Sequence, residues 1–439
     1  MSDDAQLRSE LRDDLRHRLR PLTNIVPKGR SRPVTPLELL YDLTYVIAFG
    51  VAAEEFAASV AEGHVAAGVG AYLFAMFSVG WAWLNFTWYA SAYGNDDALF
   101  RVATIVQMVG ALILVFGLPQ SFHDAAEGHN PNNLLMVIGY IVMRVPLILL
   151  WLRAARHDPT HRATAIAYAV TITLAQTGWL LTAIIPMPAL VAVLALVVLV
   201  AAEMVTRVII EKRLGWTPWN AGHIAERFGL LTLIALGEVI AATTRTVIVL
   251  TQEQGWSVGA VVIAASGLVL AAGLWWAYYL VPSRVILSRW PERVFAWRYT
   301  HLLLFAAIPA VGAGLRIAAE ALEGGEVTLL TITIALVVPV GSVIVLVFVL
   351  WSILMRSYDL THVPLLAVTL VPLAAAIVVA VIAGTDAPFD AHDASDLAAL
   401  VAVIALVALS AVVEVVGHEI VGYSHTVRVL ERPADLIPQ

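Results

Sequence analysis

The sequence predicts an all-α polytopic membrane protein with about twelve transmembrane helices. Hydrophobic residues make up 60% of the 439 residues and charged residues 13%, whereas about a quarter of a typical soluble domain is charged. The mean hydropathy is +0.83, and apolar runs long enough to cross a bilayer recur along the chain. The sequence contains no cysteine, which excludes disulfides, thiolate metal sites and cysteine nucleophiles.

The first 33 residues carry eight basic side chains and no apolar segment of the kind that a signal peptide needs. We expect residues 1–33 to form a basic cytosolic arm, which either lies on anionic lipid or is a solvated tail.

Apolar run length, together with interruptions by Pro, Gly, Asn and Asp, predicts where each span begins and ends. The expected spans are roughly 35–61, 64–93, 98–122, 132–156, 160–185, 188–213, 222–250, 257–281, 296–321, 327–356, 362–383 and 396–420. The segments between them are too short to fold as separate domains.

The distribution of basic residues predicts the orientation of the chain. With the N-terminus in the cytosol, about 23 of the 26 Lys and Arg residues fall at cytosolic loops or at cytosolic ends of spans. The exceptions are Arg144, Arg245 and Arg316. An even number of spans also returns the C-terminus to the cytosol, so we expect a multi-pass protein of the plasma (cell inner) membrane with both termini cytosolic.

Five pairs of similar segments recur in the same order in the two halves. They include the pairs Glu38 with Glu226, Arg101 with Arg298, Trp151 with Trp351, and Glu203 with Glu414. We therefore expect two parallel six-helix repeats, residues 34–215 and 216–425, followed by a cytosolic tail, 426–439. The functional site is expected between the two halves.

The first expected span begins with a helix-start signal and two carboxylates. Thr35 is a helix cap, Glu38 follows three residues later as in a capping box, and Asp42 lies one turn further on. Tyr45 and Phe49 continue the same face at helical spacing. Acids inside a span are costly unless they are paired or wetted, so these four side chains indicate an ion path. In the alternative, Glu38 only closes the capping box and Asp42 only holds a neighbouring helix.

Other charges lie inside the expected spans, mostly in their cytosolic halves. They are Arg101, Arg144, Glu203, Arg207, Glu226, Arg227, Arg298, His301, Glu414 and His418. Lone ions are costly in a membrane, so we expect them to pair, Glu203 with Arg207 in its own helix among them. The set forms either a polar vestibule or proton relay, or ion-pair clamps that hold each six-helix bundle together.

Glu238 and Arg144 lie nearer the middle of their spans than the other charges. Gly237 precedes Glu238, and a glycine beside a buried acid permits close helix approach or leaves room for water and ions. Glu238 therefore joins Glu226 as an ion-pathway candidate on the seventh span. The alternative is that Glu238 and Arg144 pair with each other.

Motifs for catalysis and cofactor binding are absent from the sequence. It has no phosphate-binding glycine loop and no HExxH segment, and its histidines lack metal-ligand spacing. We expect no metal, no cofactor and no catalytic residue. One rival hypothesis is a membrane-embedded or lipid-modifying enzyme, for which His301 and His418 are the candidates.

The run Glu38-Leu-Leu-Tyr41-Asp42-Leu-Thr-Tyr-Val resembles the opening motif of the bacterial low temperature requirement protein A (LtrA) family, typically Glu-Leu-Phe-Phe-Asp-Leu-Val-Phe-Val. The resemblance continues at Trp88-Tyr89, Arg101, Glu226-Arg227-Phe228-Gly229 and the aromatic group 275–279, over about residues 35–425. Leu280 follows the aromatics, where the family often has Asp. The resemblance implies an integral membrane protein, and the family is named for a growth phenotype, which does not state an activity.

The chain resembles the two-repeat endolysosomal potassium and proton channels more loosely. That family also has six helices per repeat, and it has an aromatic-Ser-Asp motif on its pore-lining first helix. Tyr41-Asp42 is similar but lacks the serine, and Leu230 occupies the matching position in the seventh span. The similarity implies a common architecture.

Together these observations predict a transporter or channel that moves a cation, a proton or a small solute through a route lined by spans one and seven. The expected partners are the lipid bilayer and that ion or solute; a homodimer is compatible with the sequence, and no nucleic acid is expected. A second rival is a non-transporting structural component of a stress response, in which the internal charges are fully paired.

Overall fold

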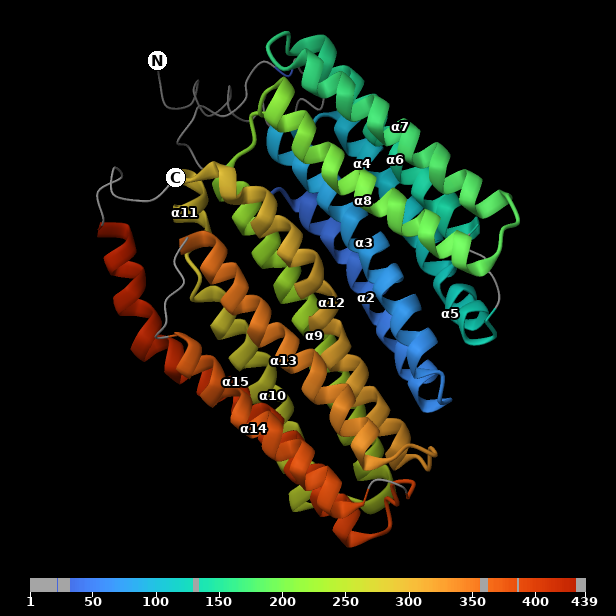
Figure 1. Ribbon diagram of the computed structural model, residues 1–439, viewed down its shortest axis with the longest axis vertical. Helices are drawn as coiled ribbons and strands as arrows, with labels where there is room; N and C mark the ends of the chain where they lie inside the picture. Colours follow the sequence, from blue (N-terminus) through green and yellow to red (C-terminus); the bar gives the residue numbers. More distant parts are fainter. Residues whose placement is uncertain (1–21, 23–31, 129–133, 356–361, 385–386, 432–439) are drawn as a thin grey trace, which may run out of the picture. The chain divides into compact units, whose positions relative to one another are not determined.

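A computed structural model describes residue 22 and residues 32–128, 134–355, 362–384 and 387–431. These residues form helices and connecting turns, with no strand among them (Figure 1). The predicted arm 1–33 lies almost entirely outside the described residues. The last helix continues to Glu431, so the first six residues of the predicted tail 426–439 are helical. Residues 432–439 lie outside the described part.

The described helices follow the predicted spans closely. They are α2 (Pro36–Ala61), α3 (Val65–Tyr93), α4 (Ala98–Phe116), α5 (Leu118–Ala126), α6 (Leu134–His157), α7 (Arg162–Ile184), α8 (Ala189–Leu214), α9 (Ala221–Gln254), α10 (Val258–Tyr279), α11 (Ser283–Arg289), η1 (Pro291–Arg293), α12 (Val294–Leu322), α13 (Leu329–Met355), α14 (His362–Ala383) and α15 (Ala394–Glu431).

Twelve helical segments in the described residues are long and apolar enough to cross a membrane. Three of these segments combine neighbouring elements: α4 with α5, α10 with α11, and η1 with α12. The predicted fold class and the predicted number of spans are therefore confirmed. The division into two parallel repeats at 215/216 stays a prediction.

The chain folds as two compact units. Unit 1 comprises Met1–Tyr45, Ala82–Gly117 and Asn132–Ile224, and unit 2 comprises Val46–Trp81, Leu118–Pro131 and Ala225–Gln439. Helices α2, α3 and α9 each contribute one part to each unit.

Unit 1 is built on the sequence of contacts α4–α6, α6–α7 and α7–α8. α4 and α6 approach each other closely where Gly110 faces Gly139. A Cβ atom added to Gly110 would lie 2.7 Å from the Gly139 carbonyl oxygen, and one added to Gly139 would lie 2.6 Å from the Gly110 carbonyl oxygen. Small residues at this crossing let two apolar helices pack backbone to backbone without a large side chain between them.

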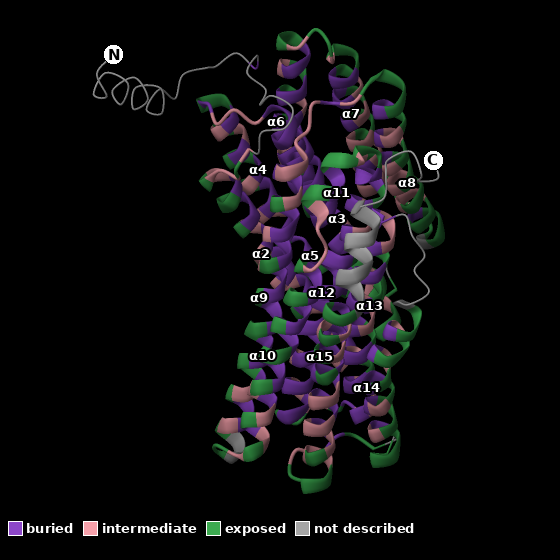
Figure 2. Cartoon of the chain, turned by 90° about the vertical axis from the view of Figure 1, so that its left-hand side faces the viewer, coloured by how far each residue is buried: buried purple, intermediate pink, exposed green. Residues whose placement is uncertain are grey.

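Unit 2 contains α12 packed against α13, and α15 packed against α10, α13 and α14. α12 belongs to the most enclosed of the twelve segments: 89% of its most apolar 18-residue stretch is buried (Figure 2, purple). A polar side chain on α12 therefore meets other helices rather than lipid. This placement makes Arg316 on α12 central to the site described below.

Candidate functional site

The first turn of α2 forms the predicted capping box. Glu38 accepts hydrogen bonds from the Thr35 amide and hydroxyl, both 2.9 Å, and the Glu38 amide donates to the Thr35 hydroxyl over 3.3 Å. Glu38 is fully buried and also lies 3.2 Å from an Arg32 guanidinium nitrogen and 3.1 Å from the His223 Nε2. The capping role that the sequence left as an alternative is thus observed, with two added partners that join α2 to the start of α9.

Asp42 and the aromatic residues after it are buried in α2. The indole N–H of Trp83 donates to Asp42 over 2.6 Å, and Asp42 is fully buried. The Tyr41 and Tyr45 hydroxyls lie 2.7 Å apart. Phe49 is 1% exposed. The predicted face of α2 therefore points into the protein.

Glu203 and Arg144 approach each other inside unit 1. The Trp179 indole donates to Glu203 over 2.6 Å, and the Arg144 Nη2 lies 4.0 Å from a Glu203 oxygen. The guanidinium of Arg207 donates to Thr171 over 3.1 Å. These contacts join α6, α7 and α8, as expected of a clamp that holds the bundle together.

Glu211 is a buried carboxylate that we did not predict as a site residue. It is fully buried and accepts four hydrogen bonds: from the Trp88 indole at 3.0 Å, the Tyr168 hydroxyl at 2.7 Å, and the amide and hydroxyl of Thr217 at 2.8 and 2.9 Å. The four donors are neutral and come from three places in the chain. Of the two isoleucines that precede Glu211, Ile210 is buried and Ile209 is 47% exposed, so the local sequence contains no signal that Glu211 is enclosed.

Arg101 lies at the start of α4 and is partly exposed. It contacts Asp96 through two hydrogen bonds of 2.9 and 2.7 Å, and both side chains are about one-third exposed. The neighbouring Asp97 is fully buried, caps α4 through the Phe100 amide and forms an ion pair with Arg153. Asp97 and Arg153 are thus the buried pair at this helix end.

His301 and Arg298 on α12 have aromatic surroundings. The His301 ring lies 3.0 Å from the Tyr278 hydroxyl and 2.8 Å from the Trp297 carbonyl, and it packs against Phe228 in a T-shaped arrangement. The Arg298 guanidinium lies over the Phe295 ring, 4.3 Å from its centroid. These contacts are those of packed interior side chains.

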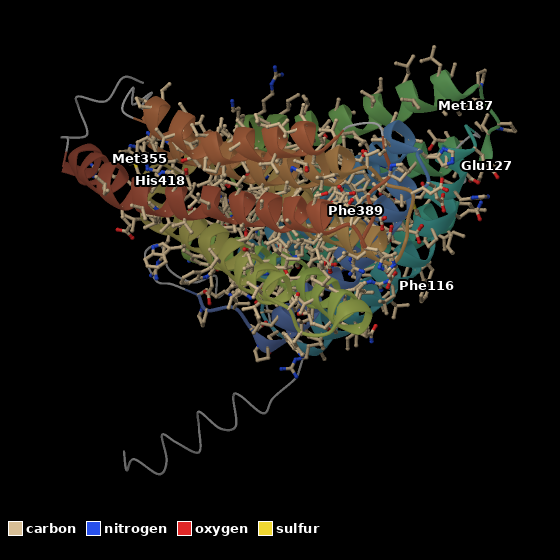
Figure 3. All side chains as sticks on the ribbon, turned by 90° about the horizontal axis from the view of Figure 1, so that it is seen from below. Phe116, Glu127, Met187, Met355, Phe389 and His418 are labelled. Atoms are coloured by element: carbon tan, nitrogen blue, oxygen red, sulfur yellow. The ribbon has the colours of Figure 1, made fainter. Side chains whose placement is uncertain are left out.

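Glu414 and His418 lie one turn apart on α15. The His418 Nδ1 is 2.7 Å from Glu414, which also accepts a hydrogen bond from Thr369 on α14 over 3.0 Å. The His418 ring, labelled in Figure 3, packs against Phe348 on α13 with ring centroids 5.0 Å apart. This predicted pair of charges is therefore a local contact that joins α14 to α15.

Glu238, the charge nearest the middle of α9, is paired with Arg316, one of the three basic residues that do not fall at the expected cytosolic positions. The Arg316 Nε and Nη2 lie 3.0 and 2.5 Å from the Glu238 Oε1. The Glu238 side chain is 8% exposed and that of Arg316 is 17% exposed. We call these two residues the central pair. Glu238 is therefore balanced by Arg316 on α12, and this contact replaces the alternative in which Arg144 is its partner.

Two glycines pack against Glu238. A Cβ atom added to Gly50 on α2 would lie 3.2 Å from the Glu238 Oε2, and one added to Gly312 on α12 would lie 2.9 Å from its Cγ. Tyr72 on α3 interacts electrostatically with Glu238, and its hydroxyl donates to the Ala306 carbonyl over 2.6 Å. The Oε2 of Glu238 thus lies against α2 at Gly50, which has no side chain.

Helices α2 and α9, the first and seventh spans, contact each other within each unit. Glu38 meets His223 in unit 1, and Gly50 meets Glu238 in unit 2. The second contact lies C-terminal to the first on both helices, so α2 and α9 run parallel. On α9, Glu226 is exposed and the adjacent Arg227 is fully buried.

No group of three or more His, Cys, Asp or Glu side chains is arranged to hold a metal ion in the part of the chain that the structure describes.

A family model described as "Bacterial low temperature requirement A protein (LtrA)" matches residues 33–417. The chain is also 25% identical over 256 residues to "Uncharacterized protein RA0937" of Rhizobium meliloti (strain 1021). That alignment covers 55% of this chain and 57% of that protein, so the two match over little more than half their lengths. No solved structure matches the chain.

Proposed function

The chain belongs to the bacterial low temperature requirement A family, and on this premise we propose that it transports a small cation or proton across the membrane along α2 and α9. The observation that carries the proposal is Glu238, a nine-tenths buried carboxylate at the middle of a span. Its Oε1 takes both Arg316 contacts, while its Oε2 faces Gly50.

Energetics favour a functional role for this carboxylate. An acid at the centre of a span costs roughly 2.5–3.5 kcal/mol to insert. Arg316 offsets part of this cost for Glu238, yet the guanidinium is itself a second charge in the membrane. An apolar pair of similar size would hold α9 to α12 at least as well, because a buried ion pair is weak support for stability. The central pair is therefore better explained by ion binding than by packing alone.

Three other carboxylates, Glu38, Glu203 and Glu414, fit a structural role more closely. Glu38 closes a capping box, Glu203 is held by Trp179, and Glu414 is held by Thr369 and His418. Each is enclosed by contacts that tie neighbouring elements together. We accordingly place the transport group at Glu238 and assign these three carboxylates to the scaffold beside the route.

The glycine facing Glu238 provides a matched test of this proposal. In proteoliposomes, Gly50→Ala is expected to lower cation or proton flux on the order of tenfold, because the new methyl group would displace the Glu238 Oε2. Gly237→Ala is the control: its Cβ would meet nothing within 4 Å. Equal flux in the two variants, or no flux from the wild-type protein above empty liposomes, would count against the proposal.

A further inference from the structure

Carboxylates gather beyond the central pair, toward the C-terminal ends of α2 and α12. Glu54 lies one turn beyond Gly50 on α2, Glu320 lies one turn beyond Arg316 on α12, and Glu323 follows α12 directly. We call Glu54, Glu320 and Glu323 the acidic entrance. All three belong to unit 2, as does the central pair.

Glu320 connects the acidic entrance to the central pair. It interacts electrostatically with Arg245, Glu323, Arg316 and Glu54. Arg245 on α9 lies 3.9 Å from Glu323, and both side chains are about half exposed. The three carboxylates of the acidic entrance thus outnumber the two guanidinium groups that interact with Glu320, those of Arg245 and Arg316. A surface with an excess of carboxylates raises the local concentration of cations.

A separate observation links this surface to a ligand. Glu238 is 8% exposed, and among the described residues its Oε2 accepts no hydrogen bond. The side chains that face Glu238 from other helices are Tyr72 on α3 and Arg316 on α12, with Gly50 on α2 contributing none. The Oε2 atom is therefore an acceptor with room for a proton.

We propose that protons reach Glu238 through the acidic entrance and that Arg316 is an exchangeable counter-ion, which passes from Glu238 to Glu320 when Glu238 is protonated. This inference rests on the proposed function and commits it to the proton. An O–H bond of a hydronium ion at the entrance breaks, an O–H bond forms at the Glu238 Oε2, and water is released. Arg316 keeps its protons and pairs with Glu320, four residues on, at the spacing that suits an ion pair within one helix.

The site suits a proton better than a metal ion. One carboxylate oxygen is enough to hold a proton, whereas Ca²⁺ takes six to eight oxygen ligands and Mg²⁺ takes six. The described residues hold no cluster of three metal-ligating side chains. Tyr72, Arg245 and the acidic entrance are titratable groups facing this region, and Glu55 interacts electrostatically with Glu54 and Glu62. The Tyr72 hydroxyl is already engaged with Ala306.

The test compares proton flux, read by a pH dye inside proteoliposomes, between the wild-type protein and three variants. Glu320→Gln is expected to lower proton flux about tenfold, the lower end of the effect of focusing charges on association rates. Glu326→Gln is the control, because Glu326 is exposed beyond the end of α12. Arg316→Lys keeps the positive charge and is expected to retain flux with a shifted pH profile. A separate potassium gradient measures potassium flux in the same vesicles.

The outcomes separate this inference from the proposed function. A loss of proton flux in Glu320→Gln but not in Glu326→Gln, together with a shifted pH profile in Arg316→Lys, supports the proton route. Potassium flux without proton flux, or proton flux that Glu320→Gln leaves unchanged, overturns this inference and leaves the proposed function standing. An absence of both fluxes in the wild-type protein overturns both. Size-exclusion profiles identify a variant that fails to fold, and Glu54→Gln then replaces Glu320→Gln with the same expected direction.

Discussion

Glu238→Gln is expected to reduce ion flux in proteoliposomes by about 100-fold or more, since loss of a positioned proton-transfer group typically costs 10²–10⁴-fold. The amide has nearly the same size and still accepts a hydrogen bond from Arg316, but it neither takes up a proton nor carries a negative charge. The contacts of Gly50 and Gly312 with this side chain would be retained. The flux is measured with a pH dye in one set of vesicles and a potassium-sensitive dye in another.

Loss of the charge must be distinguished from loss of the fold in this variant. Breaking a buried ion pair costs about 3–5 kcal/mol when the remaining charge has no access to water. Arg316 is 17% exposed, so we expect a smaller cost and a folded protein. Thermal unfolding in detergent and the size-exclusion profile serve as the controls. A folded Glu238→Gln variant with wild-type flux would show that the transported ion does not use this carboxylate.

Glu211→Ala is expected to destabilise the protein by at least about 3 kcal/mol. The substitution removes the acceptor of four buried donors, and each buried donor left unsatisfied costs about 1–3 kcal/mol. Two of these donors, Trp88 and Tyr168, lie on α3 and α7, and Thr217 lies in the segment before α9. The measurement is equilibrium unfolding in a denaturing detergent, followed by loss of helical circular dichroism.

An exposed carboxylate provides the matched comparison for Glu211. Glu226→Ala removes a side chain that is exposed on α9, and exposed substitutions usually change stability by no more than about 0.5 kcal/mol. Glu211→Gln keeps one acceptor oxygen and should fall between the two. A stability of Glu211→Ala within error of Glu226→Ala would mean that the four hydrogen bonds contribute little to the fold.

Local sequence patterns were sufficient for the spans and for the start of α2. The apolar runs predicted the twelve helical segments that the described residues contain, because a membrane requires each segment to bury its own backbone polar groups as helix. The Thr35 and Glu38 contacts depend on a spacing of three residues, which is written directly in the sequence. The contacts of Glu38 with His223 were not predicted, because they depend on how α9 begins relative to α2.

Partners that come from distant helices could not be predicted. Glu238 was predicted as a mid-span carboxylate, but its partner is Arg316 rather than Arg144, a choice that depends on which helices are neighbours. Glu211 was missed because it lies close to Lys212 and Arg213, which are typical of a helix end in the cytosol. Its burial arises from Thr217 and Trp88, which are six and 123 residues away. The sequence therefore shows which charges lie inside the spans, whereas the packing of the helices determines which groups they pair with.

Flux through the wild-type protein is the first test of the proposed transport. The purified protein is placed in liposomes, an outward potassium gradient or a pH gradient is imposed, and the rates of potassium and proton movement are compared with those of empty liposomes. We expect proton movement well above the leak of empty liposomes. Rates equal to those of empty liposomes under both gradients would contradict it and would leave the central pair as a purely structural contact.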